Sequence, residues 1–117
     1  MKLSEVVKVM GLKIFNPEVE GWEMIEVSWG YASDLLSDVI AGLSKDELWV
    51  TIQRHLNVVA VAKLKDGAGI VITKGIIPDD ATIKKATEEG VVLLGTEMNT
   101  FEFCGKLYNL LKYGEIR

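Results

Sequence analysis

The sequence predicts an α/β fold of three layers, α/β/α, in which a mainly parallel sheet of about four to five strands lies between helices. Short apolar runs alternate with segments of helical pattern, as they do in parallel α/β proteins. The run 70–72 is β-branched throughout, which is typical of a strand buried on both faces at the centre of a parallel sheet. Gly75 and Pro78 then lead into a polar helical segment and so complete a βα unit.

Toward the N-terminus the pattern predicts a helix over residues 1–10, with Ser4 as its cap and Gly11 as its stop. The pair 14–15 is a candidate short strand. Residues 22–29 alternate imperfectly between polar and apolar side chains. We interpret them as a strand whose change of phase marks a bulge or burial on both faces.

A helix is expected after residues 30–34, which break this strand. Ser33 or Asp34 can cap the helix, which extends to about Ala41 and ends at Gly42. The apolar residues Leu35, Leu36, Val39, Ile40 and Leu43 fall on one stripe of it.

The next strand is expected at 48–52. Residues 57–65, which follow it, are almost wholly apolar and fit either a strand or a helix. We prefer a helix, because two parallel strands need a crossover and no other segment is free to provide one. The central strand is then placed at 69–73.

The C-terminal part is expected to contain a helix at 78–89 ended by Gly90, a strand at about 91–95, and a last helix to Tyr113 capped by Asn99 or Thr100. The last helix has an unusually wide apolar stripe. One face carries Phe101, Cys104, Tyr108 and Leu111, and Phe103, Leu107 and Leu110 lie beside it. A single sheet face does not need so wide a stripe, so a second partner is expected there.

Composition predicts one domain over residues 1–117, with 49% hydrophobic and 26% charged residues. The net charge of −4 argues against binding to nucleic acid. One cysteine cannot form an intrachain disulfide, which favours a reducing cytoplasm. We see no signal peptide and no apolar run long enough to span a membrane.

The sequence contains no recognisable catalytic constellation. The glycines of Gly67-Ala-Gly69 precede their strand, so they do not form a dinucleotide fingerprint, and Gly105-Lys106 is not part of a phosphate loop. His55 is the only histidine and cannot build a His-rich metal site, and Cys104 has no base to activate it. We therefore expect no catalysis, no metal and no cofactor.

If a ligand binds, the carboxyl ends of the parallel strands are the expected place. Strand exits at 29–33, 53–57, 73–75 and 96–100 gather at one edge, where helix N-termini present free N–H groups. The candidate residues there supply positive charge or hydroxyls, and we expect a small anion, bound more strongly in mild acid through the histidine. Alternatively, the hydroxyls only cap helices and the arginine pairs with a nearby carboxylate. The candidates are Arg54, His55, Thr73, Lys74, Gly75, Thr96 and Thr100.

A spaced pattern extends over about residues 24–112 and consists of Thr51–Gln53, Val58–Ala62, Ala68–Gly75, Pro78-Asp79, Leu94–Thr96 and Thr100–Glu102. This pattern resembles a DRTGG domain. Lys74 stands where the family has a glycine, and Gln53 stands near the position where the family often has an aspartate before an arginine. The resemblance implies a fold similar to the N-terminal domain of HPr kinase.

The resemblance also implies a role. Such domains accompany phosphotransacetylases and CBS-containing pyrophosphatases as regulatory units and tend to dimerise, and stand-alone members resemble accessory proteins encoded near iron hydrogenases. We therefore expect a non-catalytic regulatory module whose partner belongs to hydrogenase or acetyl-phosphate metabolism. The alternative is a sensor of a small anionic metabolite or nucleotide.

Three features of the sequence favour a homodimer. The mean hydropathy of +0.22 is high for so small a chain. Residues 58–64 are nearly all apolar, and the last helix has its wide stripe. Each of these indicates apolar surface beyond what one core requires.

Overall fold

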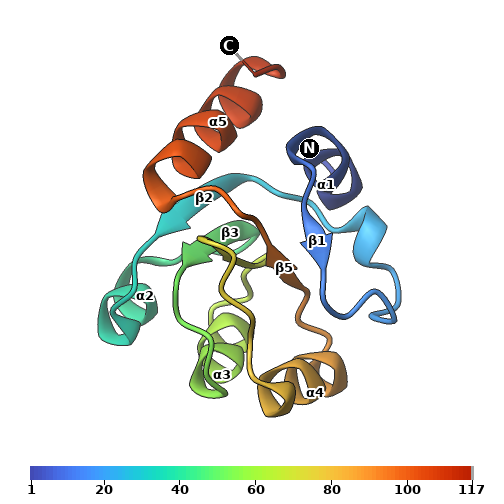
Figure 1. Ribbon diagram of the computed structural model, residues 1–117, viewed down its shortest axis with the longest axis vertical. Coiled ribbons are helices and arrows are strands. Elements are labelled where there is room, and N and C mark those ends of the chain that lie inside the picture. The colour runs from blue at the N-terminus through green and yellow to red at the C-terminus, as the bar shows by residue number, and fades with distance from the viewer. Residues whose placement is uncertain (117) are drawn as a thin grey trace.

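The computed structural model describes residues 1–116 and contains a single sheet with helices on both faces (Figure 1). Each of the last four strands is followed by a helix. In chain order the elements are α1 (Leu3–Met10), β1 (Lys13–Ile14), the 3₁₀ helix η1 (Trp22–Met24), β2 (Trp29–Ala32), α2 (Leu36–Gly42), β3 (Glu47–Thr51), α3 (Asn57–Leu64), β4 (Gly69–Ile72), α4 (Asp80–Glu89), β5 (Leu93–Gly95) and α5 (Thr100–Tyr113).

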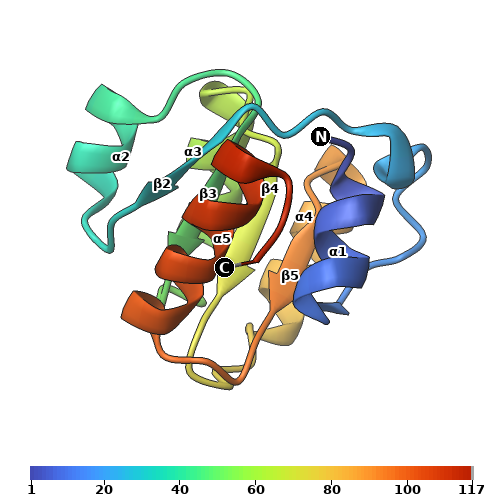
Figure 2. The same cartoon turned by 90° about the horizontal axis from the view of Figure 1, so that it is seen from above.

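The sheet has the order β1-β5-β4-β3-β2. Strands β2 to β5 are parallel to one another, and β1 pairs antiparallel with β5. Helices α2, α3 and α4 cover one face, while α1 and α5 cover the other (Figures 1 and 2). The predicted α/β/α architecture with a mainly parallel sheet is confirmed.

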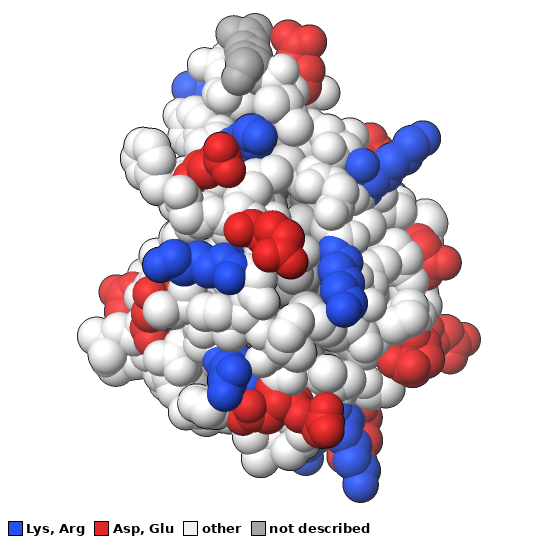
Figure 3. Space-filling model, in the orientation of Figure 1, with Lys and Arg blue, Asp and Glu red and all other residues white. Residues whose placement is uncertain are grey.

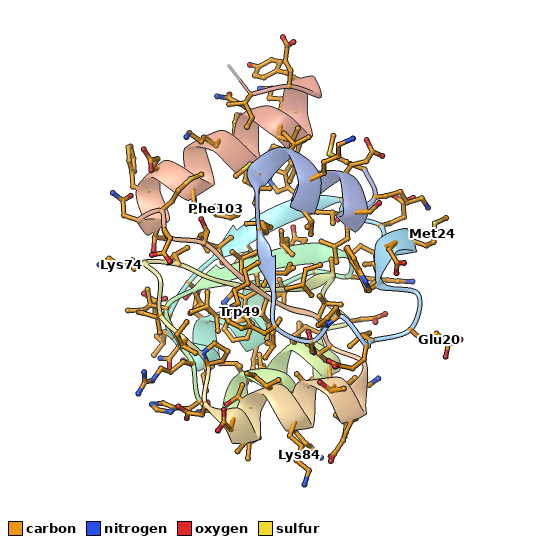
Figure 4. The ribbon with its side chains drawn as sticks, turned by 45° about the vertical axis from the view of Figure 1, so that its right-hand side comes forward. Glu20, Met24, Trp49, Lys74, Lys84 and Phe103 are labelled. Atoms are coloured by element: carbon orange, nitrogen blue, oxygen red, sulfur yellow. The ribbon has the colours of Figure 1, made fainter. Side chains whose placement is uncertain are left out.

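Alternation along the central strands divides the core in two. Val71 faces α1 and α5, whereas Ile70 and Ile72 face α3 and α4. All three are fully buried, which explains the unbroken β-branched run. Figure 4 shows the largest fully buried side chain of each half, Phe103 beneath α5 and Trp49 on the opposite side of the sheet.

The apolar segment 57–65 forms helix α3, as expected of a crossover between β3 and β4. Val58, Val59, Val61 and Ala62 are all buried between the sheet and helices α2 and α4. The apolar content of this segment therefore serves the core of the chain itself. It no longer indicates a surface for a partner, although Leu64 remains exposed.

The predicted strand at 22–29 is wrong in position. Residues 22–24 form η1 after Gly21, which is left-handed with a φ of +76°. The next residues run beside the start of α1, where Ile25 accepts a hydrogen bond from the N–H of Leu3. The strand begins only at Trp29 and continues through Gly30, which we expected to break it. A Cβ at Gly30 would lie 3.2 Å from Leu107 Cδ2, so glycine here permits the close approach of α5.

Some of the expected helix caps also differ. Neither Ser4 nor Asp34 caps a helix: α1 has Lys2 at its N-cap position and α2 has Leu35, both without a side-chain bond. Asn99 does cap α5 as predicted, because its Oδ1 accepts a hydrogen bond of 2.8 Å from the N–H of Glu102.

Candidate functional site at the carboxyl edge of the sheet

The four parallel strands end at one edge of the sheet, so the four predicted exits do lie along it. The structure divides the seven candidate residues into three groups. Arg54 and His55 lie at the start of α4, Thr73 and Thr100 lie between β4 and α5, and Gly75 and Thr96 lie beside β1. Lys74 points outward (Figure 4).

Arg54 and His55 are paired with Asp79, the residue that precedes α4. His55 Nδ1 lies 2.7 Å from Asp79 Oδ2, and Arg54 Nε lies 3.6 Å from Asp79 Oδ1. The carbonyl oxygen of Arg54 also accepts hydrogen bonds from the N–H of Asp79 and the hydroxyl of Thr82. These two side chains thus fasten the β3 exit to α4, in line with the alternative that the arginine pairs with a carboxylate.

The loops after β4 and β5 are joined to each other. The hydroxyls of Thr73 and Thr100 share a hydrogen bond of 2.7 Å, and the side chain of Thr73 is fully buried. The N–H groups of Lys74 and Gly75 donate to Met98 O and Thr96 O at 2.8 and 2.9 Å. Both of these donors have positive φ, a conformation that Gly75 adopts freely and that costs energy at Lys74.

Asp34 ties together the exits of β2 and β3. Its Oδ1 accepts hydrogen bonds of 2.9 Å from the Thr51 hydroxyl and from the N–H of Ile52, and its carbonyl oxygen accepts one from Gln53. Sequence reasoning assigned Asp34 to a helix cap and so missed this role. An aspartate two residues after a strand carries no local signal that distinguishes the two roles.

A cleft of about 140 Å³ opens at the β1 side of this edge. It brings Gly75 and Thr96 together with Lys13 and Phe15, which the sequence analysis did not select, and with Glu97. Lys13 Nζ lies 5.0 Å from the centre of the Phe15 ring. Lys13 lies beside the strand exits because β1 pairs antiparallel with β5. The sequence did not reveal this position, since a strand of two residues has too short a pattern to be recognised.

Charge along this edge is mixed. Carboxylates of Asp34, Asp79 and Glu97 lie among the candidate cations. On the face seen in Figure 3, acidic and basic side chains are likewise interspersed. Within residues 1–116 no group of three or more His, Cys, Asp and Glu side chains is arranged to hold a metal ion.

The sheet and its two helical layers make this chain a three-layer α/β domain. Comparison with known proteins shows which of them it resembles. No model of a known protein family matches the chain, and no curated protein matches it. A crystal structure does: that of the CBS and DRTGG domains of the regulatory region of Clostridium perfringens pyrophosphatase, complexed with the activator diadenosine tetraphosphate.

This match has a TM-score of 0.72 at 13% sequence identity and covers 92% of the chain. It covers 45% of the other chain, so the present protein spans less than half of the structure that it matches. The fold is therefore DRTGG-like, as the sequence pattern indicated. In the part of the chain described, no helix is long and apolar enough to cross a membrane.

Proposed function

We propose that this protein is a non-catalytic regulatory module that forms a homodimer and modulates a metabolic enzyme. The similarity of its fold to part of a pyrophosphatase regulatory region supports the regulatory role. The resemblance of its sequence to DRTGG domains supports a partner in hydrogenase or acetyl-phosphate metabolism. The homodimer is supported by the chain's own surface.

The observation that carries the proposal is the second apolar face of α5. Phe103, Leu107 and Leu110 are buried against the sheet, with at most 3% of each exposed. On the other side of the helix Phe101 is 90% exposed and Tyr108 is 46% exposed. Large aromatic side chains left in water are typical of surfaces that meet a partner.

The polar groups of the carboxyl edge support a non-catalytic role. The only histidine and its neighbouring arginine are engaged with Asp79, and the buried hydroxyl of Thr73 is engaged with Thr100. Cys104 is half-buried, and burial raises the pKa of its thiol, which disfavours the reactive thiolate. These side chains fasten loops together and are not arranged as a nucleophile with its base.

Light scattering at micromolar concentration tests the dimer. The expected mass is twice that of the 12.9 kDa chain. Candidate enzymes of acetyl-phosphate and hydrogen metabolism are then assayed with and without the dimer, which is expected to change their rates. A mass of one chain contradicts the dimer. Turnover of ATP, pyrophosphate or acetyl phosphate by this chain, lost on changing one of its residues, contradicts the non-catalytic role.

A second candidate function is that of a sensor for a small anionic metabolite or nucleotide. The cleft beside β1 favours it, because Lys13 joins two of the expected residues, Gly75 and Thr96, around a space open to solvent. The activator in the similar structure is an adenine nucleotide, diadenosine tetraphosphate. The presence of Glu97 in the same cleft disfavours a highly charged anion.

Chemical-shift mapping with phosphate, acetyl phosphate, AMP and diadenosine tetraphosphate tests the sensor. Shifts of Lys13, Gly75 and Thr96 amides that saturate at millimolar ligand are the expected result. Shifts confined to the amino ends of the strands, or none, contradict the sensor.

A further inference from the structure

A cleft of about 140 Å³ lies between α5 and the edge strand β2. It is lined by residues 29–32 of β2 and by Cys104, Leu107 and Tyr108 of α5, and it is mostly apolar. The ring of Trp29 packs edge-on against Tyr108, with 5.1 Å between the ring centres. An apolar cavity of about 150 Å³ accepts a benzene molecule, so this cleft has the size for one phenyl ring.

The same helix presents such a ring. Phe101 is 90% exposed and lies about two turns before Tyr108, which lines the cleft. Phe101, Gly105 and Tyr108 recur at i, i+4 and i+7 and so share one face of α5. In Figure 2 α5 lies in front of the sheet beside α1. All three residues of this face are exposed.

Gly105 has no function within the single chain that explains a glycine. It lies in the middle of α5, is exposed, and a Cβ built on it meets nothing within 4 Å. Glycine at such a position costs about 1 kcal/mol relative to alanine. A missing side chain between two exposed aromatics does, however, allow a second helix to approach closely.

The charges of α5 suit a second copy of the same helix in the opposite direction. Glu102 lies in its first turn and Lys112 in its last. In an antiparallel pair of α5 helices, the acidic first turn of one copy lies toward the basic last turn of the other. The two helix dipoles then point in opposite directions, which is the favourable arrangement. With the crossing beside Gly105, Phe101 of one copy faces Tyr108 of the other.

We propose, building on the homodimer above, that two copies pack through antiparallel α5 helices that cross at Gly105, with Phe101 of each copy in the α5–β2 cleft of the other. Ring and cleft lie on one surface of each chain, so a two-fold axis satisfies both contacts at once and closes the dimer. A standard interface needs about 800 Å² from each partner. One helical face is smaller than that, so the contact extends over Trp29 and the open edge of β2.

Sedimentation equilibrium of three proteins tests this packing. We expect Phe101→Asp to raise the dissociation constant of the dimer at least about 30-fold, as loss of a central aromatic contact does. Phe101 is exposed, so the variant is expected to keep its fold, checked by circular dichroism. The matched control is Ile77→Asp, since Ile77 is 55% exposed and lines the cleft beside β1, not the α5–β2 cleft. Its dissociation constant is expected to equal that of the wild type.

Crosslinking gives a second, independent measurement. Gly105→Cys in a Cys104→Ser background is expected to form a covalent dimer on mild oxidation, because the two Cα atoms at the crossing come within disulfide range. Lys84→Cys in the same background is the control, since Lys84 is exposed on α4, remote from α5 (Figure 4). It is expected to give no covalent dimer.

The outcomes separate this packing from the proposed function. A wild-type dimer that Phe101→Asp leaves intact, or that Ile77→Asp dissociates equally, overturns the α5 packing and leaves the dimeric module standing. So does a Gly105→Cys protein that stays uncrosslinked while it is dimeric. A wild-type chain that is monomeric overturns both, even if another protein or a small molecule occupies the cleft.

Discussion

Asn16 is a single side chain that holds an edge of the sheet in place. It is fully buried, its Nδ2 donates to Val91 O, and its Oδ1 accepts from the N–H of Leu93, each bond being 2.8 Å long. These bonds satisfy backbone groups at the entry to β5. They also position β1, and with β1 the cleft that contains Lys13.

We predict that Asn16→Ala lowers the free energy of unfolding by about 2–4 kcal/mol, because it leaves two buried backbone groups without partners. Urea denaturation measures this change. Asn57→Ala, at an exposed position, is the control and is expected to change stability by less than about 0.5 kcal/mol. Equal effects of the two substitutions contradict the role given to Asn16.

Cys104 carries a prediction about pH. Burial raises the pKa of its thiol above the ordinary value of 9.0. The folded state therefore favours the neutral thiol, and this preference is present below pH 9 and is lost as the pH rises through the higher folded pKa. We expect thiol-specific reagents to react with Cys104 more slowly than with the urea-unfolded chain at neutral pH. A titration of reaction rate that reaches its midpoint at or below 9.0 contradicts this.

Two glycines, one in β2 and one in α5, lie within secondary-structure elements for different reasons. Gly30 of β2 faces Leu107 of α5, whose Cδ2 would lie 3.2 Å from an added Cβ, so the glycine gives α5 room inside the chain. Gly105 of α5 faces nothing inside the chain. The first is explained by the monomer, and the second is explained by the partner helix that we propose.

We therefore predict opposite effects of alanine at the two positions. In a monomeric Phe101→Asp background, Gly105→Ala is expected to raise the free energy of unfolding by about 0.5–1 kcal/mol through helix propensity. Gly30→Ala is expected to lower it, because the added methyl group crowds Leu107 Cδ2. Urea denaturation of both variants checks the signs, and a loss of stability at Gly105 would contradict the account of α5.

The elements also show what the sequence could predict. Strands β3, β4 and β5 and the helices after them carry strong local patterns, so their order and type were predicted. Strand β2 was misplaced because Gly30 reads locally as a break, while its packing against α5 is a distant contact. The bonds of Asp34 and Asn16 likewise join residues far apart in the chain and leave no periodic signal.

In the molecule as a whole, the face of the sheet on which each helix lies decides where a ligand could bind. Helices α2, α3 and α4 pass over one face, and α5 passes over the other. The loops after β4 and β5 therefore run to opposite faces of the sheet. In many α/β proteins two neighbouring loops that separate in this way leave a ligand-binding crevice between them. Here the hydrogen bonds of Thr73, Lys74 and Gly75 bridge the two loops. The remaining cleft lies to one side, next to β1.

The candidate residues at this edge stay a prediction as ligand contacts. The sequence indicated a parallel sheet, and in a parallel sheet the residues that follow the strands lie at one edge. The partners of these residues could not be predicted, because a sequence does not show which carboxylate lies next to Arg54 and His55. The outer apolar stripe of α5 was visible in the spacing of its residues. In the structure Phe101 and Tyr108 of that stripe are exposed, whereas Cys104 and Leu111 pack against the core.

Native mass spectrometry of the purified protein is the sharpest test of a dimeric regulatory module, because it reports the oligomer and any retained ligand together. We expect a species of twice 12.9 kDa without added mass. A dimer that retains a nucleotide would turn the assignment toward the sensor. A species of one chain at micromolar concentration, with nothing bound, would contradict the dimeric module.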